Sequence, residues 1–559
     1  MPNRYDILRA ISRSEPEGKP IKTGTWRKIA PFFDEKKSPC AYFCPCAENI
    51  PVWMDLAGRG NFGKAWEVLT EENPFPMICG RACYRFCEKE CNRKESEEGI
   101  SINSIERFLG DFGIKNNFRA FINENGGIGG LKVAIIGGGP AGLSAAHFLA
   151  KEKADVAIFD KNSSLGGMLA IGIPQYRLPK KLLEAEIRNM VLSLGVETKL
   201  GFNVGVREFS GIKERFDFVV VALGAHKSKK INDQINDSAR IMPGLEFLRI
   251  VNSGAIKKLS FMKRVCVVGG GNTAVDVSRV LLRLGVEDVS IVYRRTENEM
   301  PAHHDEIEAA KKEGVCFSFL TQPVSASYDI REKMSIRCRK MELSESDESG
   351  RRKPVEIPGS EFEISCDFLF YAVGEETDKS FLSGINHKFE TENDFADGRV
   401  ICAGDALYGP RSVSEAISSG KKAAFAIIEK AGRGKKEKDG RKIVEAKDIK
   451  FHYINRRRKN SAISSEKKLT PEEFFAFEET TKTITAEAAV EEAIRCINCG
   501  ICTNCQRCFN FCPDFSILEE KAGNKLMIDL EYCKGCGICA EVCERGVISS
   551  RKEGGDEHS

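Results

Sequence analysis

The stretch LKVAIIGGGPAG, residues 131–142, decides the fold class of this 559-residue chain. Apart from Lys132, its first six residues are apolar, as expected of a buried parallel strand. Gly137, Gly139 and Gly142 follow in the pattern G-x-G-x-x-G. These glycines allow a tight turn, a close approach of the backbone to a pyrophosphate, and close packing of the next helix. The stretch therefore predicts a strand, a glycine turn, and a helix whose N-terminus faces a phosphate.

The residues that follow complete a dinucleotide-binding pattern. LSAAHFLAKE continues as the helix, and ADVAIFD forms a second strand that ends in Asp160, 23 residues after Gly137. A carboxylate at this place accepts hydrogen bonds from a ribose 2′-OH. A lone glycine motif is weak evidence, but here strand, helix, strand and acid stand in register. An unliganded glycine-rich turn is the alternative.

A second copy of the pattern occupies residues 264–295, with Gly269, Gly271 and an alanine in the third place, which is an accepted variant. Its second strand ends in Arg294 and Arg295 instead of an acid. Two guanidiniums bind a 2′-phosphate well, whereas an acid would repel it. This favours NADPH over NADH, the alternative being arginines that simply face solvent. Two such folds, 132 residues apart, predict one site for FAD and one for a nicotinamide.

Composition excludes several classes of protein. Lys and Arg number 84 and Asp and Glu 81, a net charge of +3, which argues against a dedicated nucleic-acid binder. No run of about 18 apolar residues predicts a membrane span, and the first residues lack the apolar core of a secretory signal. We therefore expect a cytoplasmic protein. In that reducing compartment, clustered cysteines indicate metal or redox chemistry.

The C-terminal cysteines carry the most specific signal. Ten of the 22 cysteines lie between Cys496 and Cys543, and eight of them form two C-x2-C-x2-C-x3-C runs. This is the spacing of a bacterial ferredoxin with two [4Fe–4S] clusters, in which the fourth cysteine of each run ligates the other cluster. Zinc is the alternative, and Cys496 and Cys499 form a surplus pair. The two predicted ligand sets are Cys502, Cys505, Cys508 and Cys543, and Cys533, Cys536, Cys539 and Cys512.

The core resembles the flavin-containing pyridine nucleotide reductases, which nest an NAD(P) domain inside an FAD domain. VVVALGA at 219–225 and FLFYAVG at 368–374 resemble the strands that lead into and out of the nested domain. GRVICAGDALYGPRSVSEAISSGKKAA resembles the closing FAD motif. The resemblance places Gly404 and Asp405 against the flavin's ribityl-phosphate side and aims the helix that begins near Ser412 at the isoalloxazine. It also includes Gly167, Asn272 and Thr273 among the cofactor-binding residues.

IPQYRLPK and YRRTENEMPAHHDEI narrow the resemblance to the small-subunit class of glutamate synthase, which includes the N-terminal half of dihydropyrimidine dehydrogenase. By this resemblance Arg294, Arg295 and the loop 299–302 line the NADPH pocket. A metal cluster at His303-His304-Asp305 is discounted, because adjacent histidines rarely converge on one ion without a third, spaced ligand.

The N-terminal cysteines resemble the iron–sulfur domain of the same class. The resemblance makes Cys44, Cys83 and Cys87 ligands of one cluster, with Glu106 as a non-cysteine ligand. Cys40 and Cys91 form half of another site. Residues 1–39 lack the upstream C-x2-C of the class. Either Cys46 or Cys79 completes the second set, or both are simply buried thiols. One or two further [4Fe–4S] clusters are expected.

The expected fold class is α/β, with two nested Rossmann-like domains, a helical N-terminal iron–sulfur domain and an α+β ferredoxin-like domain. The stretch 431–495 contains GRGKKEKDGRK and Arg456-Arg457-Arg458-Lys459, and is expected to be a solvated linker in preference to a docking surface. The expected boundaries are 1–125 (N-terminal iron–sulfur domain), 131–255 and 369–430 (FAD domain), 262–368 (NADPH domain), 431–495 (linker) and 496–550 (ferredoxin domain).

The expected function is an NAD(P)H:acceptor oxidoreductase that passes electrons between NADPH, FAD and [4Fe–4S] clusters to a protein acceptor or a larger redox complex. The same domain order resembles the flavoprotein that accompanies dissimilatory sulfite reductase. Alternatives are a true glutamate synthase subunit, an electron-input subunit running toward NADP⁺ reduction, and a scaffold with structural clusters. A disulfide reductase would need a C-x2-C on the nicotinamide domain, and residues 262–375 contain only isolated cysteines.

Overall fold

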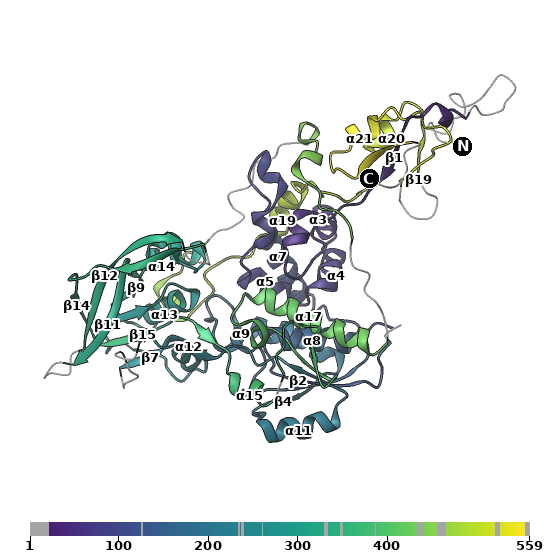
Figure 1. Ribbon diagram of the computed structural model, residues 1–559. Coiled ribbons are helices and arrows are strands. Elements are labelled where there is room, and N and C mark those ends of the chain that lie inside the picture. Colours follow the sequence, from purple (N-terminus) through teal and green to yellow (C-terminus); the bar gives the residue numbers. More distant parts are fainter. Residues whose placement is uncertain are drawn as a thin grey trace.

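The computed structural model consists of four units: two α/β units side by side, a helical unit above one of them, and a small unit at the upper right of Figure 1. It describes residues 22–124, 127–232, 235, 240–259, 261–328, 334–346, 350–385, 387–432, 440–454, 466–519 and 526–553. The expected α/β class with two nested dinucleotide-binding units is confirmed. We name the units by residues: the first α/β unit (131–228 and 375–430), the second α/β unit (229–374), the helical unit (38–118 with 484–499) and the ferredoxin-like unit (22–37 with 500–553).

The first α/β unit is built on a six-stranded sheet of order β17-β18-β5-β2-β3-β4. Its apolar strands alternate between two buried faces. Val133 and Ile135 pack under helices α8 and α17, whereas Ala134 and Ile136 face α11. The strands are β2 (Lys132–Ile136), β3 (Asp155–Phe159), β4 (Glu197–Lys199), β5 (Phe218–Val221), β17 (Phe395–Ala396) and β18 (Val400–Cys402). The helices are α8 (Pro140–Lys151), α9 (Met168–Ile171), α10 (Lys180–Met190), α11 (Val206–Arg215), α15 (Lys379–Ser383), α16 (Asp405–Tyr408) and α17 (Val413–Lys430).

The second α/β unit is inserted between β5 and β18, which pair in parallel with Val219 opposite Val400. Its five parallel strands have the order β10-β9-β8-β15-β7. The strands are β7 (Ile241–Pro243), β8 (Arg264–Val268), β9 (Asp288–Val292), β10 (Cys316–Ser318) and β15 (Phe368–Tyr371). The helices are α12 (Gly244–Asn252), α13 (Asn272–Arg283) and α14 (His304–Glu313). An antiparallel sheet follows, made of β11 (Thr321–Tyr328), β12 (Met334–Ser346), β13 (Arg352–Glu356) and β14 (Phe362–Cys366).

The chain enters the second α/β unit at residue 229, earlier than the expected boundary at 255/262. It leaves that unit at residue 374, later than the expected boundary at 368/369. β7 and β15 pair with each other inside the second sheet, with Ile241 opposite Leu369. The two crossing segments form a short antiparallel ribbon of β6 (Lys227–Ser228) and β16 (Glu375–Glu376). The boundary error arises because β7 and β15 are short apolar strands that sequence alone assigns equally well to either sheet.

The helical unit is covered by a helix that the sequence analysis assigned to a linker. α19 (Ala486–Ile494) places Ala489 and Ala493 in one core with Trp53 and Leu109. The expectation of a solvated linker is therefore wrong for residues 484–495, because this face of α19 is apolar and buried. GRGKKEKDGRK and Arg456–Lys459 lie largely or wholly outside the described residues. The other helices are α2 (Pro39–Phe43), α3 (Ile50–Gly58), α4 (Phe62–Glu72), α5 (Pro76–Ala82), α6 (Phe86–Lys89) and α7 (Ile102–Lys115).

The ferredoxin-like unit takes its edge strand from the other end of the chain. β1 (Ile29–Phe33) pairs antiparallel with β21 (Ile548–Lys552), so that the purple N-terminal strand lies among the yellow C-terminal elements in Figure 1. The expected boundary of the N-terminal domain at residue 1 is thus wrong for residues 22–37, which belong to this unit. Its remaining elements are α20 (Arg507–Phe511), β19 (Ile517–Glu519), β20 (Leu526–Ile528) and α21 (Ile538–Glu541).

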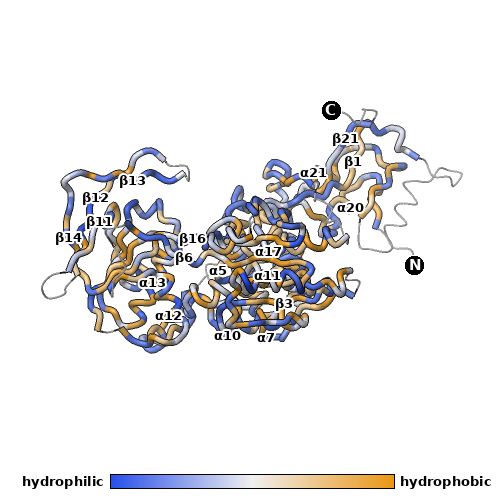
Figure 2. Tube along the Cα trace, turned by 60° about the horizontal axis from the view of Figure 1, so that its bottom comes forward, coloured by the Kyte–Doolittle hydropathy of each residue, from blue (hydrophilic) through white to orange (hydrophobic). Residues whose placement is uncertain are grey.

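Hydrophobic stretches are concentrated inside the two α/β units, where orange segments gather around β3, α17 and α13 in Figure 2. Among the described helices, none is long and apolar enough to cross a membrane.

Candidate cofactor and cluster sites

The first glycine turn has a backbone that only glycine permits. Gly137 has φ of 108°, and a Cβ atom on it would stand 2.2 Å from the carbonyl oxygen of Ala222. A Cβ on Gly142 would stand 1.9 Å from the carbonyl oxygen of Gly137. The turn is thus packed as tightly as a pyrophosphate-binding turn requires, and it leads directly into the N-terminus of α8.

Asp160, at the end of β3, supports this turn. It is buried, and its Oδ2 accepts a hydrogen bond from the backbone N–H of Gly138 at 2.7 Å. Its Oδ1 accepts another from the N–H of Asn162 at 2.7 Å. Asn162 Nδ2 also donates to Oδ1, at 2.9 Å, so that Oδ2 is the oxygen that keeps a further lone pair for a ribose hydroxyl. Gly167 packs against the same turn, because a Cβ on it would stand 2.8 Å from the Cα of Gly139.

The closing motif of the first unit returns to α8. The Gly404 N–H donates to Ser419 Oγ at 2.7 Å, and a Cβ on Gly404 would stand 2.7 Å from that of Ala141. Burial raises the pKa of Asp405 to about 6, although its Oδ1 accepts a hydrogen bond from the Arg411 N–H at 3.1 Å. A capping box of Ser412 and Glu415 starts α17 beside this carboxyl.

The second glycine turn is equally tight. Gly269 has φ of 143°, and a Cβ there would stand 2.3 Å from the carbonyl oxygen of Ala372. Asn272 at the start of α13 donates to the Tyr84 hydroxyl at 2.6 Å and accepts from the His303 N–H at 3.0 Å. Thr273 Oγ1 lies 3.4 Å from Glu375 Oε1. Asn272 therefore connects the helical unit to the second α/β unit, whereas around Gly271 a Cβ would meet nothing within 4 Å.

The two arginines after β9 differ in their surroundings. Arg294 is exposed, whereas Arg295 is 6% exposed and donates from Nε to the carbonyl oxygen of Arg352 at 2.8 Å. Both line the same cavity, as does Pro301 of the neighbouring loop. The Ala302 N–H donates to the carbonyl oxygen of Gly270 at 3.1 Å, which fixes that loop against the glycine turn. The alternative expectation is that both arginines face solvent. Only Arg294 is exposed.

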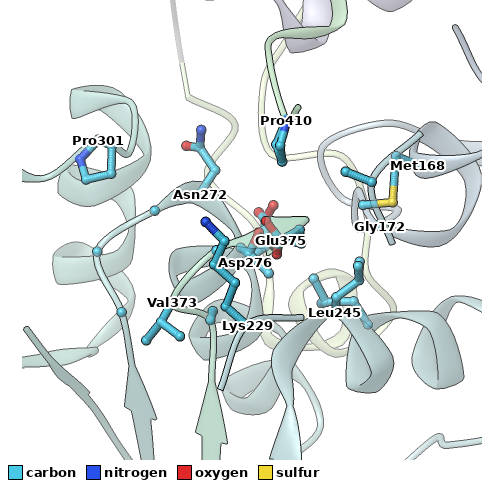
Figure 3. A pocket seen from close by; sticks show the side chains of 18 of the residues that line it. Met168, Gly172, Lys229, Leu245, Asn272, Asp276, Pro301, Val373, Glu375 and Pro410 are labelled. Atoms are coloured by element: carbon cyan, nitrogen blue, oxygen red, sulfur yellow. Dashed lines mark hydrogen bonds between the residues drawn. The ribbon is translucent and has the colours of Figure 1, made fainter. Parts of the chain in front are cut away.

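The residues of both α/β units face one cavity of about 1020 Å³. Figure 3 shows Asn272 of α13, and Lys229 and Glu375 of the crossing segments, facing this space, with Met168 and Pro410 on the opposite side. The cavity is therefore large enough to hold a nicotinamide next to a flavin, and its lining comes from both α/β units. The residues present thus fit the two nucleotides.

A buried ionic network, which sequence reasoning missed, joins the two α/β units. Arg177 of the IPQYRLPK segment donates from Nη1 to Asp276 of α13 at 2.8 Å, and its Nε lies 3.2 Å from Glu306. Arg279 binds Glu306 and Glu313. The only sequence signal was the arginine itself, because its partners come from a different domain.

Cys44, Cys83, Cys87 and Glu106, which we call the inner cysteine site, come together in the helical unit. Burial raises the pKa of the Cys87 thiol, and the neighbouring Cys44, Cys83 and Glu106 side chains add to this effect. Burial also raises the pKa of Glu106 well above its usual range. Such crowding of weak acids disfavours their anionic forms unless a cation is present, which fits an iron–sulfur cluster.

Asn73 holds the Glu106 carboxylate in place. Its Nδ2 donates to Glu106 Oε1 at 3.0 Å and to Glu48 Oε1 at 2.9 Å, and Asn103 Nδ2 donates to Glu106 Oε2 at 3.1 Å. All four side chains are buried. Glu48 is a second carboxylate of this site that the sequence analysis did not single out, and its pKa is raised by burial.

The inner cysteine site lies at the start of α17. Cys83 Sγ is 3.7 Å from Ser414 Oγ, and Cys46 Sγ is 3.5 Å from the carbonyl oxygen of Ser414. Pro45 and Asp405 line one further cavity of about 340 Å³. The cysteine loop thus touches the helix whose N-terminus belongs to the flavin motif.

Cys46 and Cys79 do not complete a set with Cys40 and Cys91. Both are 1% exposed and lie beside the inner cysteine site, where burial and the neighbouring Glu106 and Cys83 raise the pKa of Cys79 to about 12. Cys40 and Cys91 instead line a small cavity with Cys496 and Cys499.

The ferredoxin-like unit groups its cysteines in two sets. Burial raises the pKa of Cys508 to about 12, and the nearby thiols of Cys543, Cys505 and Cys502 contribute. Burial likewise raises the pKa of Cys539 to about 12, with contributions from Cys533, Cys512 and Cys536. Each group therefore holds three cysteines of one run and the fourth of the other.

The spacing of the thiols argues against zinc. Four thiolates at about 2.3 Å from zinc would stand only about 3.8 Å from one another. Among the described residues, only Glu297, His304 and Glu308 bring three metal-ligating atoms within 4.8 Å of one another, and both of these carboxylates pair with Lys311. The cysteine groups are thus more open than a zinc site, as a larger iron–sulfur core requires.

The cysteines of the second α/β unit do not form a redox-active pair beside the cavity. Cys266, Cys338 and Cys366 are buried in the core between the two sheets and are absent from the lining of the large cavity, and Cys316 is exposed on β10. This geometry does not support the disulfide reductase alternative.

Family models match three stretches of the chain. The pyridine nucleotide-disulphide oxidoreductase model matches residues 131–420, just over half of the chain. The model of dihydropyrimidine dehydrogenase domain II, 4Fe-4S cluster, matches residues 33–118, and the 4Fe-4S binding domain model matches residues 526–549.

Curated proteins are similar over most of the chain. The NADP(+)-dependent formate dehydrogenase subunit beta of Moorella thermoacetica is 35% identical over 70% of this chain, which spans 59% of that protein. The NADPH-Fe(3+) oxidoreductase subunit beta of Geobacter sulfurreducens is 32% identical over 84% of this chain and 76% of that protein. The glutamate synthase [NADPH] small chain of Escherichia coli is 30% identical over 70% of this chain and 88% of that protein. Among solved structures, Mycobacterium tuberculosis FprA in complex with NADPH is similar in fold, with a TM-score of 0.48 and 17% identity. The match covers 54% of this chain and 85% of the FprA chain.

Proposed function

The chain belongs to the pyridine nucleotide-disulphide oxidoreductase family, and on that premise we propose that it passes electrons from NADPH to a protein acceptor. It is an NADPH-dependent flavin and iron–sulfur oxidoreductase. The acceptor and the assembly in which it works are the proposed part. The beta-subunit relatives support a role as one subunit of a larger redox complex.

The shared cavity carries this proposal. The second glycine turn, Pro140 at the end of the first one, Arg294 and Asp405 line a space that extends from one α/β unit to the other. FAD bound there supplies hydride acceptance from NADPH and one-electron release to iron–sulfur clusters, so that the chain's task is to orient the cofactors and tune their potentials. The N-terminus of α17 points its positive dipole end at this space, where reduction adds negative charge.

Three cluster sites follow from the cysteine groups. We propose that the inner cysteine site holds one [4Fe–4S] cluster through Cys44, Cys83, Cys87 and Glu106. Its contact with Ser414 at the start of α17 supports a position beside the flavin. The two groups of the ferredoxin-like unit hold two more clusters, each with one ligand exchanged between the runs.

Anaerobic stopped-flow mixing of the holoprotein with NADPH tests the function. The flavin absorbance should bleach first, and the cluster absorbance should follow. Viologen reduction under the same conditions separates an electron carrier from a scaffold with structural clusters. If NADPH leaves the flavin oxidised, the nucleotide assignment is wrong. A low-potential chemical donor with NADP⁺ measures the reverse direction.

A further inference from the structure

Cys496 and Cys499 lie in the helical unit, far in sequence from the cysteines beside them. Together with Cys40 and Cys91 they line one small cavity, which we call the bridging cysteine site. Four thiols from three segments of the chain thus share one enclosed space.

Buried polar contacts hold the C-x2-C segment there. Arg495 donates to the carbonyl oxygen of Glu98 at 2.6 Å and pairs with Glu97 at 3.2 Å. Arg93 donates to the carbonyl oxygen of Arg495 at 2.6 Å. Asn498 donates to the carbonyl oxygen of Pro51 at 2.6 Å. These contacts lie inside the helical unit. They fix Cys496 and Cys499 beside Cys40 and Cys91, so that the pair belongs to the helical unit and not to the ferredoxin-like unit.

The C-x2-C turn also has the conformation of the ferredoxin turns. In Cys496-x2-Cys499 the third residue, Asn498, has φ of 54° and donates its N–H to Cys496 Sγ at 3.4 Å. In the turn that starts at Cys533, Gly535 has φ of 71° and donates to Cys533 Sγ at 3.4 Å. A backbone N–H that points at the sulfur stabilises a thiolate, as a metal ligand requires.

The four cysteines form no disulfide in this structure, and their sulfurs are spaced more widely than zinc would hold them. All four cysteines are free thiols. In the described part of the chain no three cysteine sulfurs lie within 4.8 Å of one another, whereas zinc would hold them about 3.8 Å apart. The site is lined by apolar residues such as Ile50, Ile100 and Ile497, and buried thiolates in such a setting need a compensating cation.

We propose that Cys40, Cys91, Cys496 and Cys499 hold a fourth [4Fe–4S] cluster, which connects the inner cysteine site to the ferredoxin-like unit. The C-x2-C that is missing upstream of Cys40 is thus supplied from the C-terminal part of the chain. The role of this cluster in electron transfer rests on the proposed function. The presence of the cluster does not depend on that function.

Chain geometry places this cluster between the others. Cys40 and Cys44 are one helical turn apart on α2, because the Cys44 N–H donates to the Cys40 carbonyl, so that their Cα atoms are about 6 Å apart. Cys499 and Cys502 are three residues apart, which limits their Cα separation to at most about 11 Å. The bridging cysteine site therefore adjoins the inner cysteine site on one side and the first cluster group of the ferredoxin-like unit on the other.

Iron and sulfide analysis of the anaerobically reconstituted full chain is the first test. Four clusters require about 16 iron atoms per chain, and three require about 12. The double variant Cys496→Ser/Cys499→Ser should lose about four iron atoms relative to the wild type and keep its FAD. Cys316→Ser, an exposed cysteine outside all cluster groups, should lose none.

The electron-transfer role has a separate readout. In the double variant, NADPH should bleach the flavin at the wild-type rate, while reduction of the ferredoxin-like clusters should slow at least tenfold. Dithionite should still reduce those clusters directly. A wild-type count of about 12 iron atoms overturns the proposal whether or not the variant folds, as does a double variant with unchanged iron. Failure of NADPH to bleach the wild-type flavin would instead contradict the proposed function.

Discussion

At the scale of single residues, Arg294 and Arg295 differ although they are neighbours. Arg294 is exposed at the cavity, whereas Arg295 is buried and held by the carbonyl oxygen of Arg352. We therefore expect that Arg294 discriminates between NADPH and NADH and that Arg295 supports the loop around it.

Replacing Arg294 by alanine should raise the KM for NADPH roughly 10- to 100-fold, because a charge-assisted contact is worth about 1.5–3 kcal/mol. The KM for NADH should change little. Steady-state viologen reduction with both nucleotides measures this. Arg264→Ala, at an exposed arginine that pairs with Asp288 at 3.6 Å, is the matched control. An equal rise for NADH and NADPH would contradict the role.

Glu186 on α10 is a buried carboxyl that joins the first α/β unit to the helical unit. Its two oxygens accept hydrogen bonds from the Met77 and Ile78 N–H groups at the start of α5, at 2.8 and 3.0 Å. Burial raises its pKa to about 8, although those two bonds act in the opposite direction. Folding therefore takes up a proton between the ordinary carboxyl pKa and about pH 8.

A carboxyl with a raised pKa makes the folded protein less stable as pH rises through that window, because the folded state binds more protons than the unfolded state. The wild-type melting temperature should thus fall between about pH 5 and pH 8, with an upper limit of about 4–5 kcal/mol from this group. Glu186→Gln should flatten that part of the profile. Glu184→Gln, exposed on the same helix, should retain the wild-type slope, and equal slopes in both variants would refute the assignment.

At the scale of elements, the segment before α19 is a strap between units. Phe474 of α18 (Pro471–Phe475) stacks on the guanidinium of Arg283, and Glu479 pairs with Arg81 at 2.7 Å and with Arg107 at 2.9 Å. The Arg81 side chain is 2% exposed. Residues 466–495 thus pack on the helical unit and on the second α/β unit.

Glu479→Gln should destabilise the helical unit by about 2–4 kcal/mol, because it leaves two largely buried arginines with less compensation. Thermal unfolding followed by circular dichroism measures the loss. Glu478→Gln, at the exposed preceding position, serves as the control and should shift the melting temperature little. Equal shifts in the two variants would mean that the strap contributes no specific contact.

The glycine turns, the parallel strands beside them and the two crossed cysteine groups were predictable, because each is encoded within a short stretch of sequence. The docking of α19 was not, since its charged neighbours concealed a short apolar face. Thr485 before the helix-forming AEAAVEEAI is the signal in the sequence that could have revealed α19, and the capping box Thr470-Pro471-Glu472-Glu473 could have revealed α18 in the same stretch. The partners of Cys496 and Cys499 required the fold, because nothing in their spacing specifies a distant segment.

At the scale of the whole molecule, an N-terminal segment lies in the C-terminal unit, and a C-terminal segment lies in the N-terminal helical unit. β1 completes the ferredoxin-like unit, while Cys496 and Cys499 lie in the helical unit. The two crossing segments touch where the Lys36 N–H donates to the carbonyl oxygen of Gly500 at 2.9 Å. Gly500 has φ of 78°, and a Cβ there would stand 2.5 Å from the Lys36 carbonyl oxygen.

Gly500→Ala should weaken this crossing and lower the iron content or the melting temperature. Gly432→Ala is the control, because Gly432 has the same φ of 78° and open space around it. Both variants carry the left-handed backbone penalty of about 1–2 kcal/mol, so that the excess loss in Gly500→Ala measures the steric contact. If the two variants behave alike, the crossing is not sterically constrained.

The pairing of β1 with β21 also governs how the protein is made. Residues 29–33 leave the ribosome early, but their partner strand is among the last described residues to be translated. The ferredoxin-like unit therefore cannot be completed before residues 548–552 have been translated, and the bridging cysteine site cannot be completed before Cys499. Non-local pairings of this kind form slowly. Until they form, the early cysteines stay open to oxidation and to stray metals, so that the ferredoxin-like unit can receive its clusters in a folded setting only after residues 548–552 have joined β1.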